Sequence, residues 1–168
     1  MKILFAAAAA ALCLTRPAVA QEGTPQASRQ IGEWRATRVV GANGRAVRCD
    51  GERSSPAGLI RFSAIPAREG GYTYRFTFSG APGQIDGLGA SFPVRYWVDD
   101  EATGKDTTAT VGPAGYASFT EGNDEPGSTD ALRNGRTFFI RAGQIQLNYP
   151  LRGSLPLFNF LHECADKP

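Results

Sequence analysis

The fold of this chain is decided by residues 144–164, QIQLNYPLRGSLPLFNFLHEC. Apolar and polar side chains alternate in its first part, which buries one face of a β-strand, and apolar side chains recur at helical spacing in its second part. Ser154 stands at the expected N-cap of that helix and Pro156 in its first turn. We therefore expect a last strand followed by a docked helix. The apolar face of the strand consists of Ile145, Leu147 and Tyr149. The apolar face of the helix consists of Leu157, Phe160, Leu161 and Cys164.

The helix ends in a cysteine that has one candidate partner. Cys49 and Cys164 are the two cysteines outside the N-terminal segment, so an exported chain has a single possible intramolecular bridge. Closing a loop of this length, over a hundred residues, stabilises a fold by roughly 4 to 5 kcal/mol in the chain-entropy treatment. We expect a Cys49–Cys164 disulfide, with two separate buried thiols as the alternative.

The first twenty residues have the pattern of a signal peptide. Lys2 gives a positive start, residues 3–14 are apolar, and Ala18-Val19-Ala20 is a small-x-small cleavage site. The apolar run is too short for a membrane-spanning helix, which needs about 20 residues. We therefore expect residues 1–20 to be a cleaved signal peptide.

Two further features bear on the compartment. Cys13 follows Leu12, where a lipobox requires a small residue, so we expect Cys13 to leave with the signal peptide. The chain has no Asn-x-Ser/Thr sequon, and the short Ala-rich signal is typical of bacteria. A periplasmic location follows, with release outside the cell as the alternative.

The mature chain has no formal net charge. Loss of Lys2 and Arg16 lowers the Lys and Arg count from 18 to 16, which equals the 16 Asp and Glu. A nucleic-acid-binding protein normally carries an excess of basic surface charge, so we expect no nucleic-acid partner. No later stretch is apolar enough to cross a bilayer, so we expect no membrane span.

The rest of the chain has the pattern of short strands separated by Gly and Pro turns. Residues 72–79 place four aromatic side chains on one face, which should be the central wall of the core because each would bury roughly 150 to 250 Å². Asn43-Gly44 is a strong hairpin signal. We expect a mainly β fold, an antiparallel sandwich or barrel of about nine or ten strands with one C-terminal helix.

The domain organisation is simple. Residues 21–30 are small and polar, which predicts a flexible leader. Residues 31–168 are then a single β domain, long enough to bury a sizeable core.

Candidate binding residues lie in one long loop and on the strand after it. Residues 80–93, GAPGQIDGLGASFP, exceed an ordinary connection, and long loops on β scaffolds are frequent binding surfaces. Gln84 and Asp86 are the candidates there; a loop that merely changes sheets is the alternative. Arg95 and Trp97 share one strand face and form a contact patch if that face is exposed. The alternative places Trp97 between two packed layers.

Few residues offer catalytic chemistry. His162 is the single histidine, and its one possible orienter, Asp166, lies a helical turn away, while no G-x-S-x-G elbow occurs. The acidic groups at residues 99–106 and 121–130 lack the spacing of a calcium loop. We expect no catalytic residue, no metal and no cofactor. A hydrolase using His162 or the Asp99–Asp106 carboxylates is the alternative, and calcium binding by the acidic turns stays open.

Taken together, the layout resembles that of small exported proteobacterial proteins loosely related to the invasion-associated locus B group. The shared features are Trp34 on an opening strand, Cys49 about fifteen residues later, an alternating middle, and a Gly153-Ser154 helix closed by Cys164. The resemblance implies a periplasmic β-sandwich with no catalytic residues to carry over. Pro156 departs from the pattern, in which small residues are common at the helix entry.

The sequence thus favours a non-enzymatic periplasmic binding or protein-interaction module. Its expected partner is an unknown protein or cell-envelope ligand, and we expect a monomer. An inhibitor or immunity-type protein that blocks an enzyme with a loop is a narrower alternative.

Overall fold

The computed structural model describes residues 23–67, 70–122 and 128–166. The expected signal peptide, residues 1–20, lies outside the described residues. The described elements are β1 (Thr24–Pro25), β2 (Arg29–Ile31), β3 (Trp34–Val40), β4 (Ala46–Ser55), β5 (Gly58–Pro66), β6 (Tyr72–Phe78), η1 (Asp86–Leu88), β7 (Ser91–Val98), η2 (Glu101–Thr103), β8 (Lys105–Val111), η3 (Pro113–Gly115), β9 (Ala117–Glu121), α1 (Ser128–Asn134), β10 (Thr137–Ala142), β11 (Ile145–Pro150) and α2 (Ser154–Asp166).

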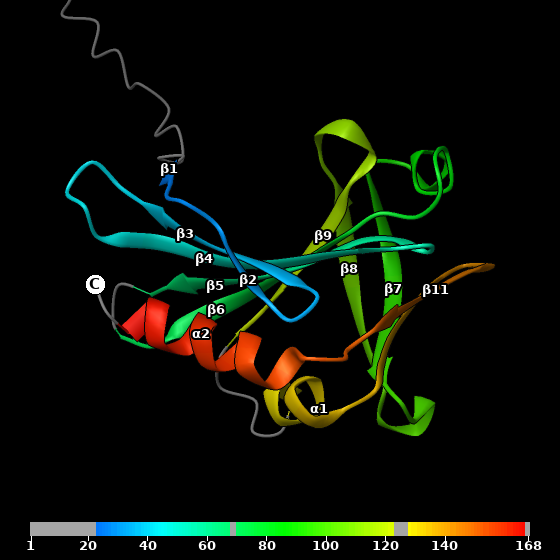
Figure 1. The fold of residues 1–168 in the computed structure, drawn as a ribbon. Helices are drawn as coiled ribbons and strands as arrows, with labels where there is room; N and C mark the ends of the chain where they lie inside the picture. Colours follow the sequence, from blue (N-terminus) through cyan, green and yellow to red (C-terminus); the bar gives the residue numbers. More distant parts are fainter. Residues whose placement is uncertain (1–22, 68–69, 123–127, 167–168) are drawn as a thin grey trace, which may run out of the picture.

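In the described part of the chain, eleven antiparallel strands form one sheet that curls around a core (Figure 1). The strand order is β1-β3-β4-β5-β6-β9-β8-β7-β10-β11, and β2 also pairs with β3. Within the described chain β11 pairs only with β10, so the sheet is not closed into a full barrel. The prediction of a mainly β, antiparallel fold ending in a helix is confirmed.

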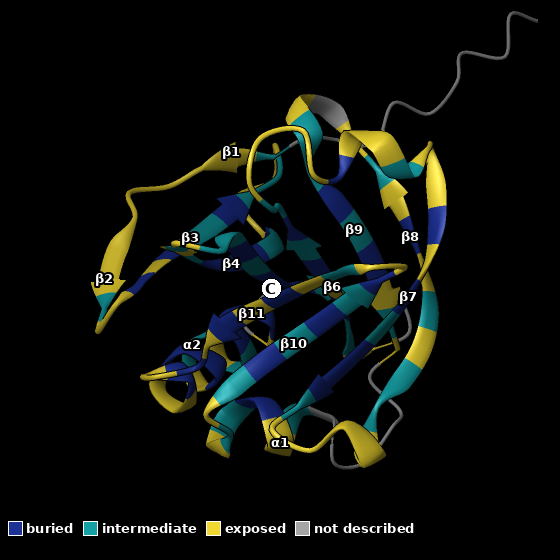
Figure 2. Ribbon diagram, turned by 90° about the vertical axis from the view of Figure 1, so that its right-hand side faces the viewer, coloured by how far each residue is buried: buried dark blue, intermediate teal, exposed yellow. Residues whose placement is uncertain are grey.

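The core lies inside the curl, where inward residues of neighbouring strands meet. Figure 2 shows buried residues alternating with more exposed ones along strands such as β10. Phe62, Phe76 and Phe138, from β5, β6 and β10, pack with ring centroids 5.6 to 5.8 Å apart. Aromatic rings at these separations add packing energy beyond the area they bury. The predicted aromatic wall on β6 is therefore the centre of the core.

Helix α2 lies across β3, β4 and β5 and covers the open side of the curl (Figure 1). Its residues Leu157, Phe158 and Leu161 are fully buried. The helix approaches β4 closely because Gly51 has no side chain: a Cβ at that position would lie 2.3 Å from Leu157 Cδ1. Gly51 thus provides the space in which Leu157 packs.

A disulfide fixes the far end of α2 to the same strand. Cys49 on β4 and Cys164 on α2 are bonded, with their Cα atoms 6.1 Å apart and a separation of 115 positions in sequence. The predicted pairing is therefore confirmed. It joins the first half of the sheet to the last helix.

Side chains bridge the remaining gap between the two sheet ends. Trp34 Nε1 on β3 donates a hydrogen bond to the carbonyl oxygen of Arg152 at 3.0 Å, and Arg53 Nη1 on β4 donates to the carbonyl oxygen of Pro150 at 3.0 Å. These bonds satisfy carbonyls at the end of β11 that have no strand partner there. They connect the chain at the end of β11 to β3 and β4.

The expected flexible leader differs from what is observed. Residues 24–25 and 29–30 of this segment, with Ile31 after it, pair with β3 as β1 and β2. Their side chains are mostly exposed, so the sequence carries no apolar signal for these strands. Main-chain hydrogen bonding to an edge strand needs no such signal.

The start of α2 also differs from the prediction. Ser154 lies inside the helix, and its Oγ donates a hydrogen bond to the carbonyl oxygen of Arg133 at the end of α1, at 3.1 Å. The hydroxyl therefore joins two helices instead of capping one. Helix α1, which is not among the elements expected from the sequence, has seven residues.

Removing the disulfide should lower the stability of the fold. For the double variant Cys49→Ala/Cys164→Ala we expect the free energy of unfolding to fall by up to about 5 kcal/mol, because the unfolded chain regains the entropy of an open loop. Denaturant titration followed by tryptophan fluorescence measures this change. Wild-type protein with reductant should lose a similar amount, and an unchanged midpoint in both would contradict the expectation.

A methyl group at residue 51 should loosen the helix. We expect Gly51→Ala to destabilise the fold by about 1 to 3 kcal/mol, because the new Cβ overlaps Leu157 and the core is already filled. Thermal unfolding monitored by circular dichroism reports the shift. Gly87→Ala is the matched control, since a Cβ there meets nothing within 4 Å.

Candidate functional site

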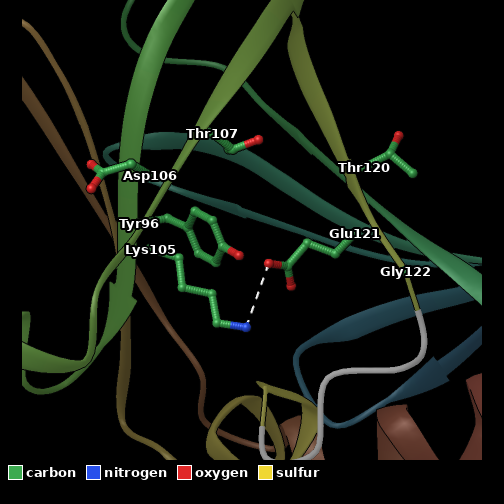
Figure 3. A pocket seen from close by; sticks show the side chains of 7 residues that line it. All are labelled: Tyr96, Lys105, Asp106, Thr107, Thr120, Glu121 and Gly122. Carbon is green, nitrogen blue, oxygen red and sulfur yellow. Dashed lines mark ion pairs between the residues drawn. The ribbon is translucent and has the colours of Figure 1, made fainter.

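The wall of the curled sheet opens between β8 and β9. The two strands pair only at Thr110 with Ser118 and at Val111 with Ala117, although β8 continues back to Lys105 and β9 forward to Glu121. Beyond the paired positions the strands diverge (Figure 3). Residues 106–109 and 119–120 therefore have no ladder partner across this gap.

A pocket of about 590 Å³ occupies this opening. Pockets that hold small ligands have volumes of about 300 to 1,000 Å³. The pocket combines inward residues of β7, β8 and β9 with outward residues at its rim. Its lining consists of Tyr96, Lys105, Asp106, Thr107, Thr120, Glu121 and Gly122.

An ion pair spans the opening. Lys105 Nζ and Glu121 Oε1 are 3.8 Å apart, and the side chain of Lys105 extends toward the carboxylate of Glu121 beside the ring of Tyr96 (Figure 3). Lys105 begins β8 directly opposite Tyr96 on β7, and Glu121 ends β9. The pocket thus brings a cation, a carboxylate and a phenol together from three strands.

The hydroxyl of Tyr96 is buried without a hydrogen-bond partner among the described residues. Tyr96 is only 7% exposed, and its ring packs on Phe119 and Phe76, with centroids 4.8 and 6.1 Å away. A buried hydroxyl that makes no hydrogen bond costs about 1 to 3 kcal/mol. Its presence at the inner end of a polar pocket therefore points to a ligand or a bound water.

Arg95 and Trp97 share the outward face of β7, as predicted, but the tryptophan is not open to solvent. Its ring stacks on Phe139 of β10 at a centroid distance of 5.3 Å and an angle of 9°. The guanidinium of Arg141 lies 5.0 Å from the ring centroid, and Trp97 is 5% exposed. The covering groups come from the same sheet, so Trp97 lies neither on an open patch nor between two layers.

Charged groups hold this outer face in place. Arg141 forms two hydrogen bonds to the carboxylate of Glu101, at 2.5 and 2.9 Å, and Arg95 donates to Asp106 at 2.7 Å. The hydrogen bond from Arg141 lowers the pKa of Glu101. Arg141 and Glu101, which are not among the predicted binding residues, therefore form the accessible ion pair beside the buried Trp97.

Gln84 and Asp86 lie toward the other end of β7. Ser91 and Trp97 are six residues apart on this strand, which at a rise of about 3.3 Å per residue separates the loop from the tryptophan by about 20 Å. The side chain of Gln84 accepts a hydrogen bond from the Ala81 amide within its own loop. Asp86 lines a separate hollow of about 430 Å³. The structure therefore does not bring the four predicted binding residues together.

The carboxylates of the acidic turn have structural roles. Asp99 accepts hydrogen bonds from the amides of Arg136 and Thr137, and Asp100 caps η2 by accepting from the Ala102 amide. Of the second acidic group, Asp124 and Glu125 lie outside the described residues. No group of three or more His, Cys, Asp or Glu side chains suited to a metal ion occurs in the described ranges.

His162 lies against two tyrosines of β6. Its Nε2 shares a hydrogen bond of 2.5 Å with the Tyr74 hydroxyl, and its ring centroid is 5.1 Å from that of Tyr72. Burial is the main cause that lowers the pKa of His162, and Arg133 lowers it further. Asp166 and Asp130 act in the opposite direction. The neutral imidazole is thus favoured in the fold.

Acidification should weaken the fold through His162. The unfolded histidine has the ordinary pKa of about 6.5 and the folded one a lower value, so the unfolded state binds more protons as the pH falls below 6.5. We expect the free energy of unfolding to decrease between pH 7 and pH 5.5. His162→Gln keeps a polar partner for Tyr74 and should flatten this dependence, which denaturant titrations at several pH values test. An equally steep dependence in the variant would assign the effect to other groups.

Sequence reasoning missed the residues of the opening. In the alternating pattern of β7, Tyr96 occupies an inward position of the kind that apolar residues usually fill. Lys105 and Glu121 stand at the ends of strands, where charged residues are common. One signal was available: three strands that are adjacent in the sheet, β7, β8 and β9, each carry a phenolic or ionisable residue at an inward position. That signal depends on the strand order, which the sequence does not specify.

The chain was compared with known proteins in three ways. Neither protein-family models, nor curated protein sequences, nor solved structures match the chain. Within the described residues no helix is long and apolar enough to cross a membrane. The site must therefore be interpreted from its own chemistry.

Proposed function

We propose that the protein is a non-enzymatic, exported binding module whose ligand enters the opening between β8 and β9. The observation that carries this proposal is the buried, unpartnered hydroxyl of Tyr96 beside the Lys105–Glu121 pair. Three polar groups of different character at the end of one pocket offer a donor, an acceptor and a group that acts as both. Such a set orients a small polar ligand or a polar segment of a partner.

The groups considered for hydrolysis support binding more than catalysis. Asp99 and Asp100 hold main-chain amides, and Asp106 and Glu101 pair with arginines. His162 is engaged with Tyr74 under α2. Of these side chains only Asp106 is among the residues that line the pocket, and it accepts a hydrogen bond from Arg95.

The disulfide supports the exported location. A single bridge between the two halves of a small domain persists in an oxidising compartment. The signal-peptide pattern of residues 1–20 and the resemblance to exported proteobacterial proteins agree with a periplasmic address. We propose that the ligand is part of a protein or of a cell-envelope component.

Phenylalanine variants of Tyr96 and Tyr149 test whether the Tyr96 hydroxyl stabilises the fold or binds a ligand. Tyr149 donates a hydrogen bond to the Ser79 carbonyl oxygen at 2.7 Å, whereas Tyr96 has no partner among the described residues. We expect Tyr149→Phe to destabilise the unliganded protein by about 1 kcal/mol, and Tyr96→Phe to leave its melting temperature unchanged or raised. Thermal unfolding of both variants beside wild type measures the difference.

The same variants test binding. We expect at least one member of a panel of the free amino acids, neutral dipeptides, hexoses and a pool of acetylated hexapeptides to raise the melting temperature of wild type and Tyr149→Phe, but not of Tyr96→Phe. If every panel member leaves the three proteins unchanged, or acts equally on all, the proposed site is wrong.

A further inference from the structure

We propose that the outer face of β3, β4 and β5 carries a second binding site, which takes the phosphate group of a monoester. The site is a hollow of about 220 Å³ on the side of the sheet opposite α2. None of its lining residues lines the opening between β8 and β9, so this inference is independent of the proposed function. Three features carry it: buried carboxylates that hold arginines, donors that these arginines do not use, and the charge of the face.

Two carboxylates lie on this outer face and are nevertheless buried. Cys49 and Gly51 of β4 face α2. The residues that alternate with them, Asp50 and Glu52, therefore point to the other side of the sheet. Carboxylates on the outside of a sheet are mostly solvated, yet Asp50 is 7% and Glu52 9% exposed. Both are paired with arginines, which offset the cost of removing a charge from water.

Three neighbouring strands surround the hollow with arginines. Arg35 on β3 and Arg61 on β5 stand directly opposite Glu52 in the sheet, and each donates to a different oxygen of its carboxylate. Arg48, two residues before Asp50 on β4, donates from Nε to both oxygens of that carboxylate at 2.9 Å. The two carboxylates thus hold three guanidinium groups at the lining of one hollow.

The arginines keep donors that the carboxylates do not use. A guanidinium has five N–H groups. Arg48 uses only the one on Nε, so both of its Nη groups are without a hydrogen bond in the described part of the chain. Among the same residues Arg61 keeps Nη1, and Arg35 keeps Nε and Nη1. Donors that other contacts already hold in place bind a ligand at a lower entropy cost than mobile ones.

Two hydroxyls add a further donor. Ser28 Oγ and Thr37 Oγ1 are 2.7 Å apart and line the same hollow. One of the two donates to the other in this hydrogen bond, so the second keeps its own O–H for a ligand. The carboxylate oxygens in the hollow already accept from arginines. What the hollow offers is therefore a set of donors, which suits an oxyanion.

The charge of the face matches a dianion. The outward positions of β3, β4, β5 and β6 carry four arginines and two carboxylates, an excess of two positive charges. The fourth arginine, Arg75 on β6, is exposed and lies in the same row as Asp50, with Ser63 between them. A phosphate monoester carries nearly two negative charges at neutral pH, whereas a carboxylate carries one.

The size and geometry of the hollow also favour a phosphate group. Its volume of about 220 Å³ lies below the roughly 300 to 1,000 Å³ of ordinary ligand pockets, so it suits a head group and not a whole sugar or nucleotide. A phosphate group presents three acceptor oxygens in different directions, which matches guanidinium groups that come from three strands. A planar carboxylate has only two.

A nuclear magnetic resonance titration tests the inference. We expect amides of β3, β4 and β5 to shift with glycerol 3-phosphate, a monoester, at constant ionic strength. Dimethyl phosphate, a diester with one negative charge, should bind roughly 5-fold more weakly, because it leaves one positive charge unmatched. Glycerol, which has no charge, should leave these amides unchanged.

Variants of the arginines assign the binding to the hollow. Arg48→Lys keeps a positive charge beside Asp50 but loses both unused Nη groups, so we expect it to fold and to bind glycerol 3-phosphate roughly 5- to 10-fold more weakly. Arg75→Gln should weaken binding about 2- to 3-fold through charge alone. Arg136→Gln, which removes an exposed arginine next to β10, is the matched control and should bind as wild type does.

Vesicles distinguish the two sources of a phosphate monoester. Co-sedimentation with vesicles of phosphatidylcholine and phosphatidic acid, but not with phosphatidylcholine alone, assigns the phosphate to a lipid. Binding of glycerol 3-phosphate without co-sedimentation assigns it to a small soluble ester. Either result supports the site when Arg75→Gln weakens it and Arg136→Gln does not.

Three results would overturn the inference. The first is an absence of shifts at about 20 mM glycerol 3-phosphate, far above a Kd of about 1 mM. The second is equally tight binding of the diester. The third is a loss of binding in Arg48→Lys and Arg75→Gln that is no greater than in Arg136→Gln; if Arg48→Lys does not fold, Arg75→Gln decides. Tyr96→Phe should bind glycerol 3-phosphate as wild type does, so failure here and failure at the opening are separate outcomes.

Discussion

The structure depends on the close approach of α2 to β4. Leu157 occupies the space that Gly51 leaves free, and the Cys49–Cys164 bond holds the helix at its other end to the same strand. These two contacts act on different terms of stability: the first is packing in the folded state, and the second limits the freedom of the unfolded chain. Together they let a sheet whose ends do not pair enclose a core, because the helix covers the side on which a ladder is missing.

This arrangement explains how the opposite wall can be open. A sheet that relied on closed strand pairing for its stability would be weakened wherever a ladder was interrupted. Here the aromatic core from Phe62 to Phe138 and the helix hold β3, β4, β5 and β6 together with β10, so the two-pair contact between β8 and β9 need not carry the fold. The opening therefore lies in a part of the wall that can expose main-chain groups at little cost to the rest.

Much of the fold follows from local patterns, and the site does not. The alternation of Tyr74, Phe76 and Phe78, the Asn43-Gly44 turn and the two available cysteines each specify a feature from neighbouring or paired residues alone. The burial of Trp97 depends on the pairing of β7 with β10, which brings Phe139 and Arg141 from some forty residues away. The pocket depends on a missing pairing between β8 and β9. Absence of a ladder has no local signature, because both strands keep the alternation of ordinary ones.

A comparison of Tyr96 with Tyr149 indicates that the Tyr96 hydroxyl has a role outside the fold. Both tyrosines point inward from the same sheet and both are more than nine-tenths buried. The hydroxyl of Tyr149 binds a carbonyl oxygen of the adjacent loop and so contributes to the fold. The hydroxyl of Tyr96 makes no hydrogen bond within the described residues. A phenylalanine would fill the same space without the cost of burying an unpaired hydroxyl. Its neighbours are a lysine and a glutamate, which also disfavour an apolar interior. A hydroxyl buried without a partner where the wall lacks main-chain bonds is costly for an isolated fold, and a polar ligand that enters the opening would satisfy it.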